Sequence, residues 1–261
     1  MSRLPRLDYA YSVGRVRALE NKLVSRDVFL EAAGERDFNS ALKIIFDAGS
    51  FLDEMNEISN SIELDQFIMS EEEALNKLSA ELFLDDSFGI MFKRDLNPSQ
   101  ALSAAEDTQY SFIIDYYRHK IDLGNIKIFF RVKYLDYTLE KLTDSLMPGG
   151  FLDDSLFVRN FELNYSEISE KLYASPYQRL WNEAVDNLQA EETFINLERG
   201  IEDFLIQYLK SAKYIVFGPE PVFAYVIAKR MELQLIRLVF VGLITKIPSK
   251  IIKKRISETY V

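Results

Sequence analysis

The feature that most constrains this chain is a long seam of apolar residues spaced three and four positions apart. Its members are Tyr110, Ile114, Tyr117, Ile121, Ile128, Val132, Leu135, Leu139, Leu142 and Leu146. Such spacing predicts an amphipathic helix in a bundle or coiled coil, with Asn125 in the one polar position, either to fix register or to bind a ligand. One unbroken helix of this length would extend about 55 Å. A break near Asp122-Leu-Gly is equally compatible, because Asp can begin a helix and Gly can end one.

Other segments show the same helical spacing: 9–23, 38–46, 75–82 and 197–208. Gly49 is expected to stop the second of these. The acidic run 71–73 is expected to begin the third, because carboxylates favour a helix N-terminus. A helix from Pro221 to about Lys246 is apolar nearly all round and should lie deep in the core, and Pro248 should open a short basic helix. With only 10 Gly and 7 Pro in 261 residues, the chain is predicted to be all-α.

The apolar seam recurs along the chain, which predicts three related helical units. At an offset of 116, the residues Arg15, Val16, Arg17 and Leu19 align with Arg131, Val132, Lys133 and Leu135. At an offset of 110, the stretch 232–240 aligns with 122–130. The expected units are 1–109, 110–196 and 197–261, with approximate boundaries, and one continuous domain is the alternative.

No residue pattern in the sequence indicates catalysis. The chain has no Cys and one His, His119, so it has no thiolate metal site and no multi-histidine site, and we expect His119 to be an exposed helix residue. Phosphate-binding loops, dinucleotide fingerprints and hydrolase motifs are absent as well. Paired carboxylates such as Asp153-Asp154 are expected to cap helices. We therefore assign no catalytic, cofactor-binding or metal-binding residue, and an enzyme that uses unrecognised carboxylates is kept as an alternative.

Charge is distributed unevenly along the sequence. The formal net charge is −10, which argues against nonspecific nucleic-acid binding. The stretch 47–115 has 16 acidic residues against three cations, whereas 246–255 has five cations and no acid. These stretches are expected to form a solvated face and a basic helix end, or to meet different partners. The sequence contains no apolar run long enough to span a membrane and no secretory signal, so the cytoplasm is the expected compartment.

A few charged and polar residues are candidates for structural pairs or partner contacts. They are Arg15, Arg17, Asn125, Arg131, Lys133, Tyr225, Glu232 and Arg237. Glu232 shares a helical face with Tyr225 and should be partly buried, so it needs a cation. Arg15, Arg17, Arg131 or another repeat-related cation is expected to supply it. A structural ion pair is favoured over a partner contact.

Three blocks of sequence resemble the C subunit of archaeal and bacterial A/V-type ATP synthases, a relative of the V-ATPase d subunit. The first contains Tyr9-Ala-Tyr11 and Gly14-Arg-Val-Arg17. The second runs from Asp122 to Lys133 and is followed by Gly149-Gly150-Phe. The third, from Phe217 to Arg255, is the most specific.

This resemblance implies a non-catalytic connector in the central stalk of a rotary ATPase. Its three related helical units would form a funnel between shaft subunits of the D and F types and the membrane rotor ring of proteolipid subunits. It would couple shaft rotation to ion transport, with no nucleotide site, no nucleic acid and no membrane span of its own. It would lie on the cytoplasmic side of the membrane. A helical adaptor without rotary function is the alternative, and the sequence leaves the coupling ion, H⁺ or Na⁺, open.

Overall fold

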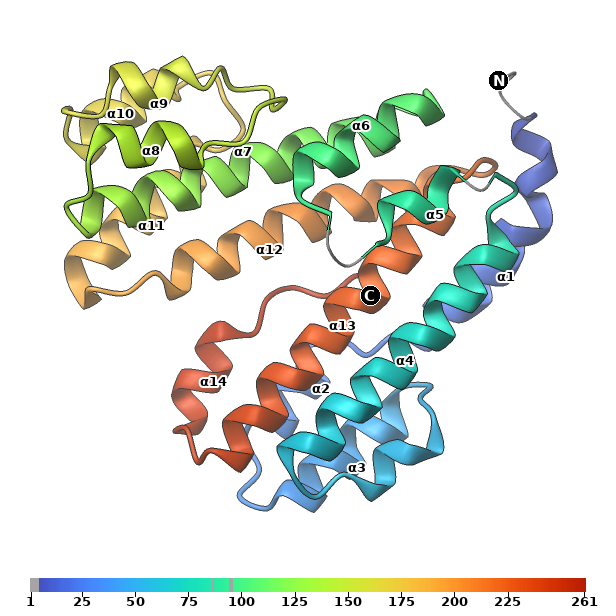
Figure 1. The fold of residues 1–261 in the computed structure, drawn as a ribbon. Coiled ribbons are helices and arrows are strands. Elements are labelled where there is room, and N and C mark those ends of the chain that lie inside the picture. Colours follow the sequence, from blue (N-terminus) through green and yellow to red (C-terminus); the bar gives the residue numbers. More distant parts are fainter. Residues whose placement is uncertain (1–4, 86, 94–95) are drawn as a thin grey trace. The chain divides into compact units, whose positions relative to one another are not determined.

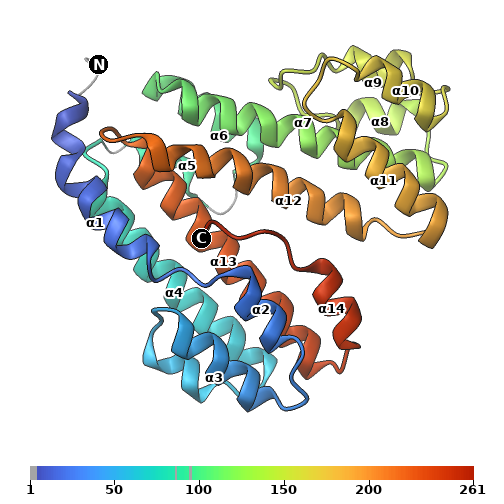
Figure 2. The same cartoon turned by 180° about the vertical axis from the view of Figure 1, so that it is seen from behind.

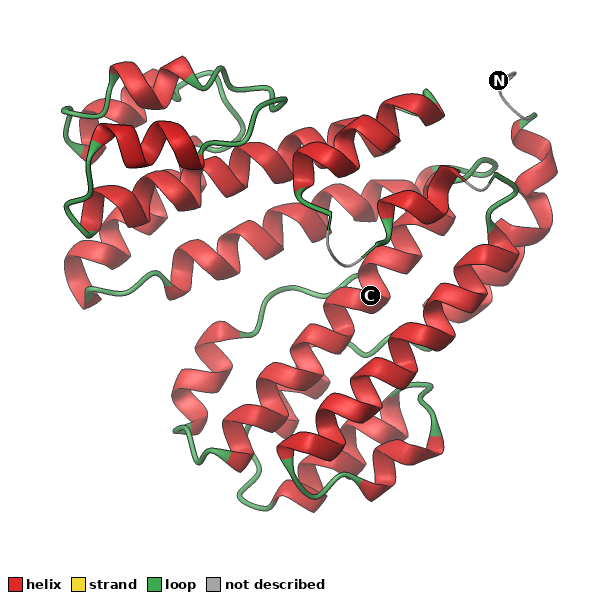
Figure 3. Ribbon diagram, viewed as in Figure 1, coloured by secondary structure: helices red, strands yellow, loops and turns green. Residues whose placement is uncertain are grey.

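The computed structural model describes residues 5–85, 87–93 and 96–261, and throughout these residues it contains helices and no strand (Figure 3). Helix makes up 73% of the described residues, so the predicted all-α fold is confirmed. The α-helices are α1 Ala10–Glu20, α2 Arg26–Ala32, α3 Phe38–Ala48, α4 Ser61–Leu82, α5 Ser87–Met91, α6 Pro98–Thr108, α7 Ser111–Tyr134, α8 Leu139–Ser145, α9 Ser155–Arg159, α10 Tyr165–Lys171, α11 Gln178–Glu191, α12 Ile195–Lys210, α13 Glu220–Ile244 and α14 Ser249–Arg255. The short 3₁₀ helices are η1 Arg6–Tyr9, η2 Asp53–Glu57 and η3 Ser211–Tyr214.

The chain divides into two compact units. The first unit combines Met1–Gly89 with Ile206–Val261, and the second unit is Ile90–Leu205. The boundaries between the units therefore fall inside α5 and α12. The division into three units that the sequence suggests stays a prediction.

In the first unit, α13 is the central helix. It contacts α1, α2, α3, α4, α14 and η3, and Figures 1 and 2 show α4 running alongside it. Its residues are buried on nearly every face, as its apolar sequence predicts. Phe240 packs against Phe38 with ring centroids 5.1 Å apart. The helix forms because Pro221 suits its first turn and nothing in the next 20 or so residues interrupts it.

The acidic run 71–73 does not begin a helix, contrary to the sequence prediction. Helix α4 starts ten residues earlier, where the side chain of Asn60 accepts hydrogen bonds from the N–H groups of Ile62 and Glu63 at 2.9 and 3.0 Å. An Asn N-cap is a stronger start signal than a run of carboxylates, because it satisfies N–H groups directly. Glu71 consequently lies in the middle of α4, where it is buried.

The second unit is built on α7, which packs along α6. An aromatic cluster forms its core: Phe130 lies 4.6 Å and Phe129 5.6 Å from Trp181, measured between ring centroids. The indole N–H of Trp181 donates to the carbonyl of Tyr165 at 2.8 Å, so the buried ring has its polar atom satisfied. Figures 1 and 2 both show the first part of α12 alongside α7.

The apolar seam from Tyr110 to Leu146 does not form one continuous helix, and the helix is not broken at Asp122-Leu-Gly. Helix α7 runs through that point and ends at Tyr134, and α8 begins at Leu139. Leu135, expected inside a helix, is the C-cap of α7 and is half exposed. The chain turns here because Asp136 adopts a left-handed backbone conformation, with φ of 54°. The side chain of Thr138 then caps α8.

The ends of α7 and α13 are built alike. Asp136 donates its N–H to Lys133 O at 3.3 Å and Tyr137 to Val132 O at 3.0 Å. At an offset of 110, Lys246 donates to Leu243 O at 3.0 Å and Ile247 to Gly242 O at 2.8 Å, and Lys246 also has a positive φ of 58°. This pair of bonds is a Schellman motif. Each motif leads after a short linker into a seven-residue helix, α8 or α14, and we call these two corners the α7–α8 elbow and the α13–α14 elbow.

Candidate functional site

The polar centre of the first unit is Glu232, which is 4% exposed on α13. Its Oε1 accepts the backbone N–H of Val24 at 2.6 Å. Its Oε2 lies 2.6 Å from the Nζ of Lys229. The cation that pairs with Glu232 is therefore Lys229, which lies three positions earlier on the same face of the helix. The arginines that the sequence suggested have other partners. Burial raises the pKa of Glu232, while Lys229 and the Val24 N–H act in the opposite direction.

Lys229 joins α13 to the segment after α3. Its Nζ donates to the carbonyl of Ser50 at 3.3 Å and lies 4.1 Å from the centroid of the Phe51 ring, over its face. Lys229 is not among the candidates that the sequence pattern predicted. Its i, i+3 spacing from Glu232 was the available signal, since a buried carboxylate on an apolar helix has its nearest cation candidates one turn away.

The other candidates of the first unit form separate contacts. Arg15 pairs with Glu81 at 2.8 Å on the surface, and Arg237 pairs with Asp65 at 2.9 Å, also on the surface. Arg17 contacts both carboxylate oxygens of Glu20 at 2.8 Å. It also donates to the carbonyls of residues 212, 213 and 215, so it closes the C-terminal end of η3. Tyr225 is buried on α13 and lines a cavity with Lys229.

The polar centre of the second unit is Asp122 on α7, which is fully buried. Its Oδ2 accepts the N–H of Phe151 at 3.0 Å and the hydroxyl of Tyr177 at 2.7 Å, and its Oδ1 accepts the N–H of Leu152 at 3.0 Å. Gly150 fits here because a Cβ at this position would overlap the Asp122 carboxylate. Burial raises the pKa of Asp122, and the hydrogen bonds from Tyr177 and the two N–H groups oppose that rise. The Gly149-Gly150 loop is therefore wrapped around a carboxylate.

His119 extends this centre and is not the exposed residue that its charged neighbours suggested. Its Nδ1 lies 2.7 Å from the Tyr177 hydroxyl. Because that hydroxyl donates to Asp122, we assign the proton to Nδ1, which then donates to Tyr177. The imidazole also contacts Phe151 and Phe204, with ring centroids 4.8 and 5.1 Å away. Burial lowers the pKa of His119, and the charge of Asp115 opposes this.

Asn125 lies one turn from Asp122 and holds the same loop. Its amide donates to Met147 O and accepts from Met147 N–H, both at 2.8 Å, and it also donates to Asp154 at 3.3 Å. Hydrogen bonds in both directions fix the backbone of Met147 against α7. The polar position in the seam thus anchors the chain that follows α8.

The remaining two candidates lie toward the C-terminal end of α7. Arg131 pairs with Glu198 of α12 at 2.7 Å, and Lys127 reaches the same carboxylate at 3.2 Å. Lys133 donates to Phe161 O at 2.6 Å and lies over the Phe161 ring at 5.4 Å from its centroid. Arg131 therefore joins α7 to α12, and Lys133 joins α7 to the loop after α9.

The two centres have in common that a carboxylate on a long helix accepts N–H groups from a loop. Among residues 5–85, 87–93 and 96–261, no helix is both long and apolar enough to cross a membrane. In the same described part of the chain, no three His, Cys, Asp or Glu residues are grouped as a metal ion would need. The fold and these centres define an all-helical protein whose buried polar groups fix the joints between helices.

Comparison with known proteins gives the family. The family described as ATP synthase (C/AC39) subunit matches residues 99–255, more than half of the chain. The chain belongs to this family, as its sequence blocks predicted. It is similar to the C subunit of the A-type ATP synthase of Halobacterium salinarum, with 23% identity over 160 residues, 61% of this chain and 45% of the relative. It is also similar to the protein of the same name from Methanococcoides burtonii, with 25% identity over 175 residues, 65% of this chain and 42% of the relative. The matches span less than half the length of these curated relatives.

Proposed function

We propose that this chain is a non-catalytic connector in the central stalk of a rotary A/V-type ATPase or ATP synthase. It would join the central shaft to the membrane rotor ring, so that rotation in the ATP-hydrolysing head and ion transport stay coupled. The observation that carries the proposal is membership of the C/AC39 subunit family over residues 99–255. The name of the relatives, which are C subunits of A-type ATP synthases, supports it.

The structure supports a mechanical role through its helix joints. The matched region contains both elbows and the two carboxylates, Asp122 and Glu232, that accept N–H groups from loops. A connector that transmits torque needs helices whose ends and loops are fixed, and hydrogen bonds from a buried carboxylate to loop N–H groups provide this. No nucleotide chemistry is needed for such a role.

We further propose that related helical units close around an axis as a funnel. The two elbows, which share a Schellman motif at an offset of 110, support a relation between the α7–α8 and α13–α14 segments. The shaft subunits of the D and F types would dock in the funnel, and the proteolipid ring would hold it at the membrane, on the cytoplasmic side. Helical units built from one repeated motif can close around an axis, because repetition sets a regular rotation between neighbouring units.

Affinity purification of the tagged full chain from native membranes tests the proposal. We expect shaft and ring subunits to co-purify with it. A chain that purifies with other partners, and never with these, would favour a helical adaptor without rotary function.

Reconstituted vesicles test the coupling itself. A complex depleted of this chain should still hydrolyse ATP, because hydrolysis takes place on other subunits, but should transport no ions. Adding back the purified chain should restore ion transport per ATP hydrolysed. Full ion transport in the depleted complex would contradict the proposal.

A further inference from the structure

The α13–α14 elbow is strongly basic, in a chain whose formal net charge is −10. Residues 246–255 contain five cations and no acid. Lys246, Lys250 and Arg255 are exposed, and none of them pairs with a carboxylate within residues 5–85, 87–93 and 96–261. The charge of these three side chains is therefore available to a partner.

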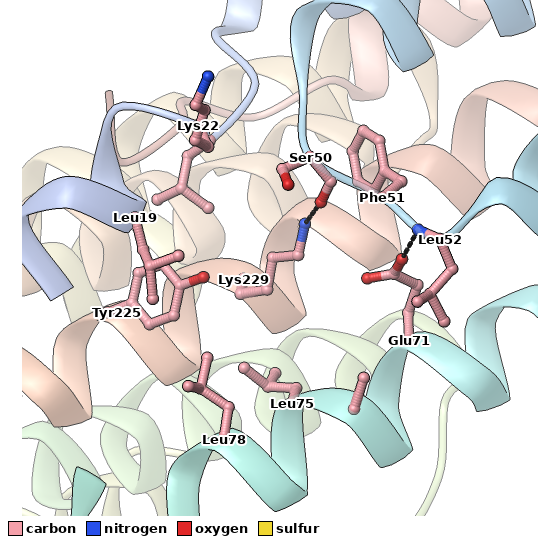
Figure 4. Close-up of a pocket in the computed structure, with 12 residues that line it drawn as sticks. Leu19, Lys22, Ser50, Phe51, Leu52, Glu71, Leu75, Leu78, Tyr225 and Lys229 are labelled. Atoms are coloured by element: carbon pink, nitrogen blue, oxygen red, sulfur yellow. Dashed lines mark hydrogen bonds between the residues drawn. The ribbon is translucent and has the colours of Figure 1, made fainter. Parts of the chain in front are cut away.

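Other cations of the first unit are neutralised by a carboxylate. Lys229 is 7% exposed and lies 2.6 Å from Glu232. Figure 4 shows the Lys229 amine inside a cavity, where it donates to the carbonyl of Ser50. Arg15 and Arg237 each form an ion pair on the surface. The elbow differs from these positions because its exposed cations have no such partner.

The turn between α2 and α3 brings acidic residues close to the elbow. Ser249 donates to the carbonyl of Ala33, and the Lys253 amine lies over Gly34, so this turn packs against the start of α14. One of its acids, Asp37, accepts the N–H of the first turn of α3. Together, residues 31–37 and 246–255 contain six cations against three acids, so the elbow stays positive with its neighbours included.

Two isoleucines are exposed among these cations. Ile247 and Ile251 are 39% and 42% exposed, and each directly follows an exposed lysine. Ile252 is buried, so the short helix α14 has one face in the core and one face of mixed isoleucine and lysine. Lysine can keep its amine in water while apolar neighbours enter a less polar layer. This combination suits the boundary between the headgroups and the acyl chains of a bilayer.

The α7–α8 elbow shows that the backbone of such a corner does not require positive charge. At the offset of 110, Asp136 and Glu140 occupy the positions of Lys246 and Lys250. Lys246 has a φ of 58°, a left-handed conformation that Asp tolerates better than Lys. Local stability therefore does not favour lysine at this corner, which is expected where a side chain serves a contact.

We propose that the α13–α14 elbow binds the surface of an anionic phospholipid bilayer, with its exposed cations at the lipid phosphates and Ile247 and Ile251 at the boundary with the acyl chains. A bilayer is favoured over nucleic acid because it offers an apolar layer to the isoleucines. It is favoured over an acidic protein because residues 246–255 offer charge of one sign only, which a uniformly charged surface matches without a specific shape. The proposal does not depend on the coupling role, since the chain alone contains the whole surface.

Flotation of the full chain with lipid vesicles tests the proposal. We expect binding to vesicles of equal parts phosphatidylglycerol and phosphatidylcholine, and none to vesicles of phosphatidylcholine alone. Binding should weaken between 0.1 M and 1 M salt, where the Debye length falls from about 10 Å to about 3 Å. Soluble glycerol phosphate should not displace the chain, because it presents no extended surface. Absence of binding to the anionic vesicles, or equal binding to the neutral ones, would overturn the proposal.

Matched lysine variants locate the binding surface. Lys246→Gln with Lys250→Gln should weaken vesicle binding about thirtyfold, because each lysine near an anionic surface contributes a factor of about five. Lys22→Gln with Lys43→Gln removes the same charge from exposed positions elsewhere in the first unit and should have little effect. Equal losses in the two double variants would show that the binding surface is not the elbow.

The isoleucines are tested separately from the charge. Ile247→Ser with Ile251→Ser keeps every lysine and should weaken binding about threefold or more. Tyr137→Ser is the control, since Tyr137 is exposed at the position of the α7–α8 elbow that corresponds to Ile247. Helical circular dichroism checks that each variant is folded. Unchanged binding by the isoleucine variant would overturn their placement in the bilayer boundary.

A comparison with the rotary partners separates the two proposals. If the elbow serves a protein partner alone, the double lysine variant should lose binding to the purified complex, while anionic vesicles bind neither this variant nor the wild type. That result overturns the bilayer proposal and leaves the coupling proposal untouched. Vesicle binding by a chain that never co-purifies with shaft or ring subunits contradicts only the coupling proposal.

Discussion

Buried carboxylates in both units accept hydrogen bonds from backbone N–H groups far along the chain. Glu232 binds the N–H of Val24, and Asp122 binds those of Phe151 and Leu152. A buried carboxylate is tolerated only when its oxygens are satisfied, so each residue fixes a loop whose N–H groups would otherwise be unpaired. Single substitutions here should change stability more than surface substitutions do.

Lys229→Met should destabilise the protein by about 3–5 kcal/mol, because it leaves Glu232 buried without its cation. The double variant Lys229→Met with Glu232→Gln should recover part of this loss. Glutamine carries no charge and can still accept the Val24 N–H. Urea unfolding followed by helical circular dichroism measures both. A double variant as unstable as Lys229→Met alone would show that charge imbalance is not the cause.

Tyr177→Phe should destabilise the second unit by about 1–3 kcal/mol, because Asp122 loses one of its three donors and His119 loses its partner. Trp181 is the only tryptophan of the chain and lies buried in this unit, so its fluorescence follows the unfolding of the second unit. Tyr173→Phe, at a position 81% exposed, is the matched control and should have little effect.

The effect of Tyr177→Phe should depend on pH. The pKa of Asp122 is raised by burial in the folded state, so its unfavourable contribution grows as pH rises from the unfolded pKa to the folded one. The contribution is absent in acid, where the carboxyl is protonated in both states. Loss of the Tyr177 donor raises this pKa further. The stability difference from wild type should therefore be largest near neutral pH and should shrink as pH falls through the folded pKa of Asp122, which lies above the ordinary Asp value of about 4. A difference that does not vary with pH would contradict the assigned role of Asp122.

Helix ends decide how the elements follow one another in this fold. Both elbows need one residue in the left-handed region, and the chain supplies Asp136 in one and Lys246 in the other. Asp tolerates this conformation better than Lys, because its short polar side chain can hydrogen-bond locally. The two elbows thus carry different amounts of backbone strain.

Lys246→Gly should stabilise the first unit by up to about 1 kcal/mol, and Asp136→Gly should stabilise the second unit by less. Lys250→Gly, inside α14, is the control and should cost roughly 1 kcal/mol of helix propensity. Thermal unfolding measures the first and third variants, and Trp181 fluorescence measures the second. If Lys246→Gly lowers the free energy of unfolding as much as Lys250→Gly does, residue 246 does not adopt the left-handed conformation in solution.

At the scale of the whole molecule, charge and exposed apolar residues are concentrated in particular stretches. The α13–α14 elbow exposes Lys246, Ile247, Lys250 and Ile251. The stretch 47–115 is strongly acidic. If the chain has the proposed function, shaft or ring subunits would bind at such charged surfaces. Their affinity for the chain should then depend on salt concentration.

Binding of the chain to its rotary partners should weaken between 0.1 M and 1 M salt, where the Debye length falls from about 10 Å to about 3 Å. The double variant Lys246→Gln with Lys250→Gln should bind less tightly at low salt and show a flatter salt dependence. Lys43→Gln, another exposed lysine of the first unit, should match wild type. Interferometry with the purified complex measures both the affinity and its dependence on salt. Affinity that does not change with salt would leave apolar docking by Ile247 and Ile251 as the main contribution.

Patterns within a few turns of one helix could be predicted from the sequence. The spacing of Phe38, Leu42 and Ile45 predicted α3, and the apolar stretch after Pro221 predicted the buried helix α13. These predictions succeed because hydrogen bonds and side-chain faces of a helix repeat every 3.6 residues or so, which makes them local. The family resemblance followed from residues of α1, α7, α13 and α14.

What only the tertiary structure decided were the partners of the polar residues. Glu232 accepts a hydrogen bond from Val24, which is 208 positions away in the sequence. Asp122 accepts one from Tyr177, which is 55 positions away. His119 looked exposed between two charged neighbours, yet Phe204 and Tyr177 cover it. A polar residue on a helix carries no local signal for which distant N–H group or ring will reach it, because that choice depends on how the helices pack. The sequence by itself therefore determined the all-helical class and the family, and packing determined the carboxylate centres, the elbows and the cavity.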